Sequence, residues 1–217
     1  KPASALIREA IAADIEILVG HAVLTAHGNH RVARVEIAPF DSASSAIDGD
    51  IIHRDCDLIA MSGGLSPAVH LHSQARGKLQ WDDKKLCFKP SKTHEASFSA
   101  GAGNGTFDLE PAIKEGIRSG ARAASVAGFK NNPAECPVIS MPKQSWIPLA
   151  AWKIPNGHAE GAGPKAFVDF QNDVTANDIS LAAREGYQSV EHLKRYTTMG
   201  MGTDQGKTSN INALAIL

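Results

Sequence analysis

The sequence predicts an α/β fold in two parts, an α/β part over 1–130 and a small all-α part over 166–217. Helical and extended patterns alternate through the first part, as they do in proteins that combine helices with a sheet. Prolines cluster over 131–165, which predicts a linker between the two parts. The last part holds short amphipathic runs with capping residues and glycine stops, which is typical of a compact helical domain.

Composition limits the class of protein. With 217 residues, 43% of them hydrophobic, the chain can bury a sizeable core. Its 22 basic and 23 acidic residues give a formal charge of -1, which gives no support to a bulk nucleic-acid or membrane-surface binder. No apolar run approaches the roughly 18 residues of a membrane span. We therefore expect no nucleic-acid partner and no membrane partner.

Cysteine usage and the chain ends suggest where the protein works. Cys56, Cys87 and Cys136 are not closely spaced, so neither a disulfide framework nor a CxxC metal site is indicated. The start of the chain does not resemble a signal peptide. A reducing, cytoplasmic location fits best. Because the chain lacks an initiator Met and ends in an apolar run over 213–217, we expect it to be a piece of a longer polypeptide.

The first elements alternate between helix and strand. Apolar residues over 5–13 recur at helical spacing and predict a short helix, and the apolar run over 15–19 predicts a buried strand. Residues 22–26 and 31–37 predict two antiparallel strands joined by a tight turn. The stretch over 41–50 is rich in Ser, Ala, Asp and Gly and predicts a loop.

The middle of the chain starts with another apolar run. Residues 56–61 predict a strand, and the small residues at 62–64 would let a ligand or another backbone approach its end closely. A helical turn is expected next, with Ser66 as N-cap and Pro67 at the first position. Residues 77–89 predict a small hairpin.

A glycine-rich turn lies between a predicted strand over 95–100 and a long Ala-rich helix over 111–129. Strand, glycine turn at 101–105 and helix are the parts of an anion cradle, since exposed amides and a helix N-terminus converge on one place. The pattern lacks a full GxGxxG motif. A tight turn kept only for its geometry is therefore an equally good interpretation.

The proline-rich linker over 131–165 also contains Trp146 and Trp152. Large apolar side chains are rarely left free in water, so the linker is expected to pack along a surface. A domain boundary is expected near this linker.

The last part predicts three short helices, two of them from their caps. Thr175 can cap the first helix, with Asp178 in a capping-box position, and Gly186 stops it. Ser189 can cap the second helix, and a final helix is expected from about Ser209.

Several motifs together resemble one known family. Three lie in the last part, QNDVTA over 171–176, EHLKRYTT over 191–198 and GMGTDQGK over 200–207. Three more lie upstream, CDLIAMSGGLSP over 56–67, HLHSQ over 70–74 and AGAGNGTFDL over 100–109. The chain resembles, over nearly its whole length, the alpha subunit of heterotetrameric sarcosine oxidase.

This resemblance implies a disulfide-reductase-type dinucleotide-binding domain, a small helical domain and then a folate-binding domain. The chain would hold the C-terminal part of the first domain (1–130), the linker (131–165) and the helical domain (166–217). The implied cytoplasmic flavoprotein complex oxidises sarcosine to glycine, passes electrons through FAD and FMN to oxygen, and transfers the one-carbon unit to tetrahydrofolate. Its partners would be the beta, gamma and delta subunits. Since the amine chemistry is implied for the beta subunit, we expect no catalytic residue in this chain.

The helical part is also similar to the 2Fe–2S domain of bacterioferritin-associated ferredoxin, which opine oxidase and proline dehydrogenase subunits share. Thiolates hold such clusters. The four aligned positions here are Asp169, Gln171, Asp204 and Ser209. None is a cysteine, so we expect no iron–sulfur cluster.

The resemblance implies that the glycine turn contacts NAD. Flavin enzymes of this fold usually have an Asp that holds a sugar hydroxyl at the place of Ala102, so its absence argues against FAD here. The predicted cofactor-binding residues of this site are Ser62, Gly63, Gly64, Gly101, Ala102, Gly103, Asn104, Gly105 and Thr106. The alternative is that the glycines serve turn geometry alone.

A second candidate site lies in the helical part. Cations and hydroxyls gather at Lys194, Arg195, Thr197, Thr198 and Lys207, and such groups can hold a phosphate. Since the family implies FMN at the contact between alpha and beta subunits, we expect this site to border the FMN phosphate. The alternative is a solvated basic helix end.

Other functions remain open. The chain could belong to an opine or amino-acid dehydrogenase, or serve as a non-catalytic assembly module. His70 and His72 lack a third ligand, so no metal site is expected.

Overall fold

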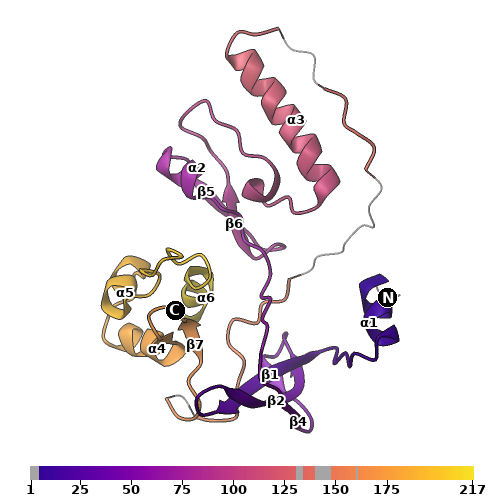
Figure 1. Cartoon of the computed structure of the whole chain (residues 1–217). Helices are drawn as coiled ribbons and strands as arrows, with labels where there is room; N and C mark the ends of the chain where they lie inside the picture. Colours follow the sequence, from indigo (N-terminus) through magenta and orange to yellow (C-terminus); the bar gives the residue numbers. More distant parts are fainter. Residues whose placement is uncertain (1–4, 131–133, 140–147, 160) are drawn as a thin grey trace. The chain divides into compact units, whose positions relative to one another are not determined.

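The computed structural model describes residues 5–130, 134–139, 148–159 and 161–217, which form a mixture of helices and strands (Figure 1). They fall into two compact units, one made of residues 1–60 and 150–217 and the other of residues 61–149. The mixed α/β class is as predicted. The part over 166–217 is not all-α as predicted, because Phe167–Asp169 and Val174–Thr175 form a short antiparallel strand pair in it. The domain boundaries at 130 and 165 stay predictions, and the two units divide the chain at other residues.

The first unit begins with α1 (Ala5–Ala12), which confirms the predicted helix. A small antiparallel sheet follows, in which β2 (Val32–Asp41) pairs with β1 (His21–Gly28) along its length. It also pairs with β4 (Ile52–Asp55) and, near its end, with the two-residue strand β3 (Ala46–Ile47). The predicted strand pair is confirmed, and the predicted loop over 41–50 contains β3.

The turn between β1 and β2 depends on Gly28. Its φ is +156°, and a Cβ at this position would overlap the carbonyl of Arg31. Only glycine fits such a close approach without a shift of the backbone. This explains the glycine at the tight connection that the sequence predicted.

The predicted buried strand over 15–19 is wrong. These residues form no strand, and Ile15 and Val19 are 58% and 81% exposed. A strand must pair its backbone groups with a neighbour, and no described strand pairs with this run. The segment is instead held at the surface by Glu16, whose carboxylate accepts two hydrogen bonds from the Arg54 guanidinium at 2.6 and 2.8 Å.

The helical part of the first unit carries the buried hydrophobic cluster of the described residues. It contains β7 (Phe167–Asp169), β8 (Val174–Thr175), α4 (Ala176–Arg184), α5 (Val190–Thr197) and α6 (Asn210–Ile216). Apolar side chains from all five pack together, and we call these residues 166–217 the helical module. The cluster consists of Val168, Val174, Ala176, Ile179, Ala182, Leu193, Met199 and Ala213.

The caps of the helical module are those expected from the sequence. Thr175 and Asp178 form a reciprocal capping box at the start of α4. The Ser189 hydroxyl accepts the N–H of His192 at the start of α5. The last helix, α6, begins after Ser209 as expected, but the Ser209 hydroxyl makes no capping hydrogen bond. Gly186, in the left-handed region with φ +95°, follows the end of α4.

The second unit contains a hairpin, a glycine turn and a long helix. The short helix α2 (His70–Gln74) precedes the hairpin of β5 (Leu79–Asp82) and β6 (Cys87–Pro90), which the sequence predicted. The turn of 3₁₀ helix η1 (Gly101–Asn104) leads to α3 (Leu109–Val126), which confirms the long helix.

Three predictions for the middle of the chain are wrong. Residues 56–61 and 95–100 form no strand, and the expected helix start at Ser66 and Pro67 is displaced to His70. Like the run over 15–19, the two apolar runs belong to no described sheet. The first run keeps one bond to a strand, since the N–H of Cys56 donates to the carbonyl of Ala33 in β2 at 3.1 Å. The second run is held instead by a side-chain contact, since the Arg122 guanidinium of α3 lies 4.5 Å from the centre of the Phe98 ring.

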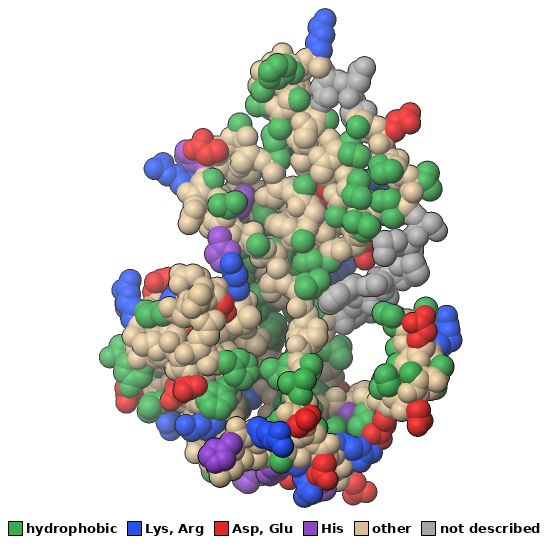
Figure 2. Space-filling view, viewed as in Figure 1, with side chains coloured by type: hydrophobic (Ala, Val, Ile, Leu, Met, Phe, Trp, Pro, Cys, Tyr) green, Lys and Arg blue, Asp and Glu red, His purple; other side chains and the backbone are tan. Residues whose placement is uncertain are grey.

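Much apolar surface remains exposed on the described residues. Figure 2 shows hydrophobic side chains in patches across the visible face, and Leu58, Met61 and Phe129 are each more than 70% exposed. No residue of the amphipathic helix α3 is buried. Among the described helices, none is long and apolar enough to cross a membrane.

Candidate functional site

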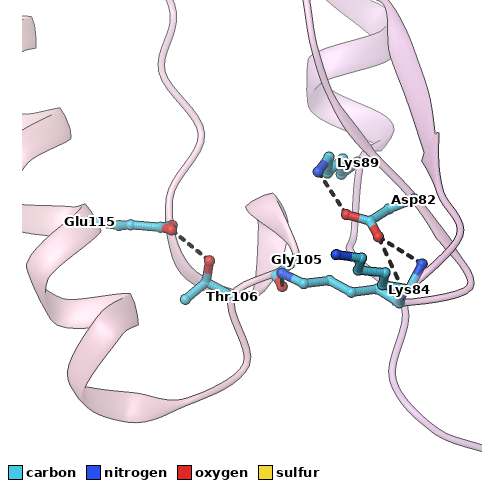
Figure 3. A network of polar contacts seen from close by, with 7 residues as sticks. Asp82, Lys84, Lys89, Gly105, Thr106 and Glu115 are labelled. Atoms are coloured by element: carbon cyan, nitrogen blue, oxygen red, sulfur yellow. Dashed lines mark hydrogen bonds and ion pairs between the residues drawn. The ribbon is translucent and has the colours of Figure 1, made fainter. Parts of the chain in front are cut away.

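The glycine turn over 101–106 is organised around a carboxylate of α3. Oε2 of Glu115 accepts the N–H of Gly101 at 3.0 Å and the side-chain amide of Asn104 at 3.3 Å. Its Oε1 accepts the hydroxyl of Thr106 at 2.5 Å (Figure 3). The donors that the sequence assigned to a ligand anion therefore converge on an anion of the protein itself.

Hydrogen bonding keeps Glu115 ionised. Burial alone would raise the pKa of Glu115, but the hydrogen bonds from Thr106, Asn104 and the Gly101 N–H outweigh it and hold the pKa below its ordinary value. Arg118, one turn further along α3, acts in the same direction. At neutral pH the turn therefore contains a full negative charge.

The tip of the hairpin contacts the same turn (Figure 3). Nζ of Lys85 donates to the carbonyl of Gly105 at 2.5 Å. The tip is itself braced by Asp82, which accepts the backbone N–H groups of Lys84 and Lys85 at 3.1 Å and the Lys89 ammonium at 2.7 Å. The Lys89 hydrogen bond lowers the pKa of Asp82. The hairpin tip therefore holds the basic side chains of Lys85 and Lys89 in fixed positions next to the glycine turn.

The backbone conformation of the turn requires glycine at two positions. Gly101 and Gly105 lie in the left-handed region, with φ of +63° and +75°, where side chains are strained. Gly103 has no such requirement, because a Cβ there would meet no atom within 4 Å. These findings favour the turn-geometry interpretation at two positions, and an NAD contact at the turn stays a prediction.

The other residues predicted for this site are open to solvent. Ala102 is exposed, and Ser62, Gly63 and Gly64 are exposed within an irregular segment. Their part in a ligand site stays a prediction.

A second polar cluster joins two loops of the helical module. Oδ1 of the buried Asp169 accepts the N–H groups of Gln171 at 2.9 Å and Asn172 at 3.2 Å, and its Oδ2 accepts that of Gly200 at 2.7 Å. Oε1 of Gln171 in turn accepts the N–H of Thr203 at 2.5 Å. The loop after β7 and the loop after α5 are thus held together by side-chain oxygens.

The other two positions aligned with cluster ligands lie in the loop before α6. Asp204 accepts the N–H of Gly206 at 3.1 Å and both the N–H and the hydroxyl of Thr208 at 3.1 and 2.6 Å. The hydroxyl of Ser209 is buried and finds no hydrogen-bond partner among the described residues. Oxygen atoms at three of the four positions thus hold backbone donors, and this donor set does not fit a thiolate-bound cluster.

The predicted phosphate site of the helical module lies around the end of α5. Arg195 and Lys207 are exposed and Lys194 is half-buried, so the cations can reach a ligand. The hydroxyls of Thr197 and Thr198 already donate to main-chain carbonyls of the same helix end, at 2.8 and 2.6 Å. A phosphate would therefore meet cations more readily than hydroxyl donors, and contact with FMN stays a prediction.

Titratable side chains also gather on the sheet of the first unit. His27 lies 2.9 Å from Glu36, and Arg34 donates to Asp55 at 2.8 Å, beside His53 in a shallow open pocket. These are partly exposed pairs on neighbouring strands. Among the described residues no group of three or more His, Cys, Asp or Glu is arranged to hold a metal ion.

An open cavity of about 580 Å³ lies in the first unit. Trp152 and residues of α4 and α6 line it, together with Lys153 and His158. The half-buried Trp152 agrees with a linker that packs along a surface. Trp146 lies outside the described residues.

Two residues of the glycine-turn site were missed from the sequence. Glu115 had a signal, since it is an acidic residue in the second turn of a helix that follows a donor-rich glycine turn. Lys85 had none, because a lysine at a hairpin tip is ordinarily a solvated surface residue.

Comparison with known proteins gives a consistent result. Residues 163–217, which contain the helical module, match the family described as the sarcosine oxidase A3 domain. Sarcosine oxidase subunit alpha of Corynebacterium sp. (strain P-1) is 33% identical over 99% of this chain, and that of Corynebacterium sp. (strain U-96) is 34% identical over 99%. The subunit of Rhizobium meliloti (strain 1021) is 37% identical over 88% of this chain. The resemblance noted from the motifs is confirmed.

The chain spans about a fifth of the length of these relatives, 22%, 22% and 20% respectively. Among solved structures, L-proline dehydrogenase from P. horikoshii is similar over 97% of this chain and 41% of its own, with a TM-score of 0.58 and 19% identity. This likeness concerns the fold.

Proposed function

Because this chain is related over nearly its whole length to the alpha subunits of sarcosine oxidase, we propose that it is the cofactor-supporting part of such a subunit. The single observation that carries the proposal is the 33–37% identity to three such subunits along 88–99% of the chain. The complete enzyme would oxidise sarcosine to glycine, reduce oxygen and transfer the one-carbon unit to tetrahydrofolate. It would assemble from alpha, beta, gamma and delta subunits and work in the cytoplasm.

The proposed part in cofactor binding begins at the glycine turn. In this proposal the turn over 101–106 and the small residues over 62–64 border a bound NAD, as the C-terminal part of a dinucleotide-binding domain. The fixed turn and the basic hairpin tip with Lys85 support this, because a nucleotide offers both hydroxyls and phosphates. NAD supplies redox or structural chemistry when bound, and this chain would bind and orient it.

The helical module would border FMN at a contact with the beta subunit. Its accessible cations Lys194, Arg195 and Lys207 support this role, because guanidinium and ammonium groups bind phosphate. We further propose that the module descends from a bacterioferritin-associated-ferredoxin-like domain. In it, side-chain oxygens of Asp169, Gln171 and Asp204 bind backbone donors in place of a cluster. FAD and tetrahydrofolate would bind elsewhere in the complex.

A second candidate is a non-catalytic assembly module. The exposed apolar residues of the second unit and the internal use of the Thr197 and Thr198 hydroxyls favour it. The opine or amino-acid dehydrogenase alternative has no comparable support, since the three similar proteins are named for sarcosine oxidase.

The experiment is purification of the assembly that carries this chain, followed by an assay of sarcosine-dependent oxygen uptake with and without tetrahydrofolate. We expect oxygen uptake with sarcosine and glycine as a product, with little response to proline or opines. Uptake with proline or an opine but not with sarcosine would refute the proposed substrate.

A further inference from the structure

Glu115 places a negative charge inside the turn at the point where the sequence predicted an anion of the ligand. Its oxygens lie 2.5–3.3 Å from three donors of the turn. A phosphate that used the same donors would have to displace this carboxylate. A phosphate placed beside it would meet the repulsion of a like charge in a partly buried site.

The same carboxylate retains one capacity for a ligand. An ionised carboxylate offers about four lone-pair positions, and the three donors of the turn use three of them. The Glu115 side chain is only half-buried, so a further donor can reach it from solvent. A sugar hydroxyl is such a donor, and carboxylates bind the ribose hydroxyls of nucleotides in this way in other folds.

We infer that Glu115 is a specificity-determining residue of the glycine turn, which excludes phosphate and accepts a hydroxyl of the nucleotide sugar. This inference rests on the proposed nucleotide site and changes which part of the nucleotide meets the turn. The phosphates would then lie toward another donor set, outside the turn.

Two substitutions separate the charge of Glu115 from its hydrogen bonds. Glu115→Gln removes the charge, while its carbonyl can still accept from Gly101 and Asn104 and its amide can donate to the Thr106 oxygen. Glu115→Ala frees all three donors next to the Lys85 ammonium and so opens an anion site. Glu110→Gln is the matched control, because it removes the same charge from an exposed position of the same helix.

Inorganic pyrophosphate is the probe for phosphate, and its binding to the chain is followed by the NMR signals of the Gly101 and Thr106 amides. The wild-type chain and Glu110→Gln should bind it equally weakly. Affinity should rise about tenfold in Glu115→Gln, from the lost repulsion alone, and further in Glu115→Ala. If Glu115→Ala does not fold, the Glu115→Gln variant still shows whether the charge of Glu115 weakens pyrophosphate binding. Unchanged pyrophosphate affinity in Glu115→Gln would overturn the inference.

NAD affinity in the assembled enzyme distinguishes the inference from the proposed function. Glu115→Gln should weaken NAD binding severalfold, because the sugar hydroxyl loses a charged acceptor. NAD binding strengthened by the same factor as pyrophosphate binding would overturn the inference, since phosphate would then meet the turn. Failure of the wild-type enzyme to bind NAD would refute the proposed cofactor, while the pyrophosphate series would still decide whether Glu115 excludes an anion.

Discussion

Asp169 and Gly200 are 31 positions apart in the chain, yet the buried carboxylate of Asp169 accepts the N–H of Gly200 at 2.7 Å. The same carboxylate also holds the turn that follows β7. It therefore holds the loop after α5 against the turn after β7, at the start of the helical module.

Removing this carboxylate should destabilise the helical module strongly. Asp169→Ala leaves three backbone donors without their acceptor, and we expect a loss of about 2–4 kcal/mol in the free energy of unfolding. Asp169→Asn should lose less unfolding free energy, because its side-chain carbonyl can still accept some of the hydrogen bonds from these three backbone donors. The measurement is urea unfolding followed by far-UV circular dichroism. Glu191→Gln, at an exposed position of α5, is the control and should change little; equal losses in Asp169→Ala and this control would contradict the prediction.

The core of the module depends on Leu193. This side chain is fully buried, so Leu193→Ala should lower the unfolding free energy by about 2–5 kcal/mol through lost burial and the cavity left behind. Leu181→Ala removes the same atoms from a residue of α4 that is 38% exposed, and should cost clearly less. Thermal melts of the two variants provide the comparison. A larger loss of stability in Leu181→Ala than in Leu193→Ala would show that the packing is not as described.

The capping box at the start of α4 makes a smaller contribution. Thr175→Ala removes the hydroxyl that accepts the Asp178 N–H, and it does so at a buried position. We therefore expect the free energy of unfolding to fall by about 1–2 kcal/mol. Ser189→Ala removes a cap from the exposed start of α5 and should cost about 0.5–1 kcal/mol. Calorimetric melts would measure both. A Thr175→Ala variant as stable as wild type would argue against the box.

The glycine turn should loosen in acid. The pKa of Glu115 is lower in the folded chain than its ordinary value of 4.5, so its carboxylate stabilises the fold above that value. This contribution is lost as the pH falls through the folded pKa. The Gly101 amide signal should therefore titrate with a midpoint below 4.5 in the wild type and lose this step in Glu115→Gln. A midpoint above 4.5 would mean that folding raises the pKa of Glu115, which would contradict the hydrogen bonds that Glu115 accepts.

Local signals in the sequence predicted the helical module well. Thr175 and Ser189 cap helices where the sequence places them, because capping depends on residues within one turn of each other. The last helix, α6, begins after Ser209 as expected. The hairpin over 77–89 and the strand pair around Gly28 were predictable for the same reason. In each case the partner lies nearby in the chain.

Elements that need distant partners were predicted less well. The apolar runs over 15–19, 56–61 and 95–100 have strand-like composition, but whether such a run pairs depends on neighbours that its own sequence does not specify. In the site, the glycine turn was predicted as a donor set. Its acceptor Glu115 was missed, because an acidic residue near the start of a helix is a signal that does not by itself specify which loop donors the side chain reaches.

The most direct test of a cofactor-supporting role is the cofactor and subunit content of the purified complex. The variants are Asn104→Ala in the glycine turn and the double change Lys194→Ala with Arg195→Ala in the helical module. The proposal predicts that the first loses bound NAD and the second loses FMN, with all subunits retained. Loss of subunits from a complex that keeps both cofactors would contradict it and favour an assembly module.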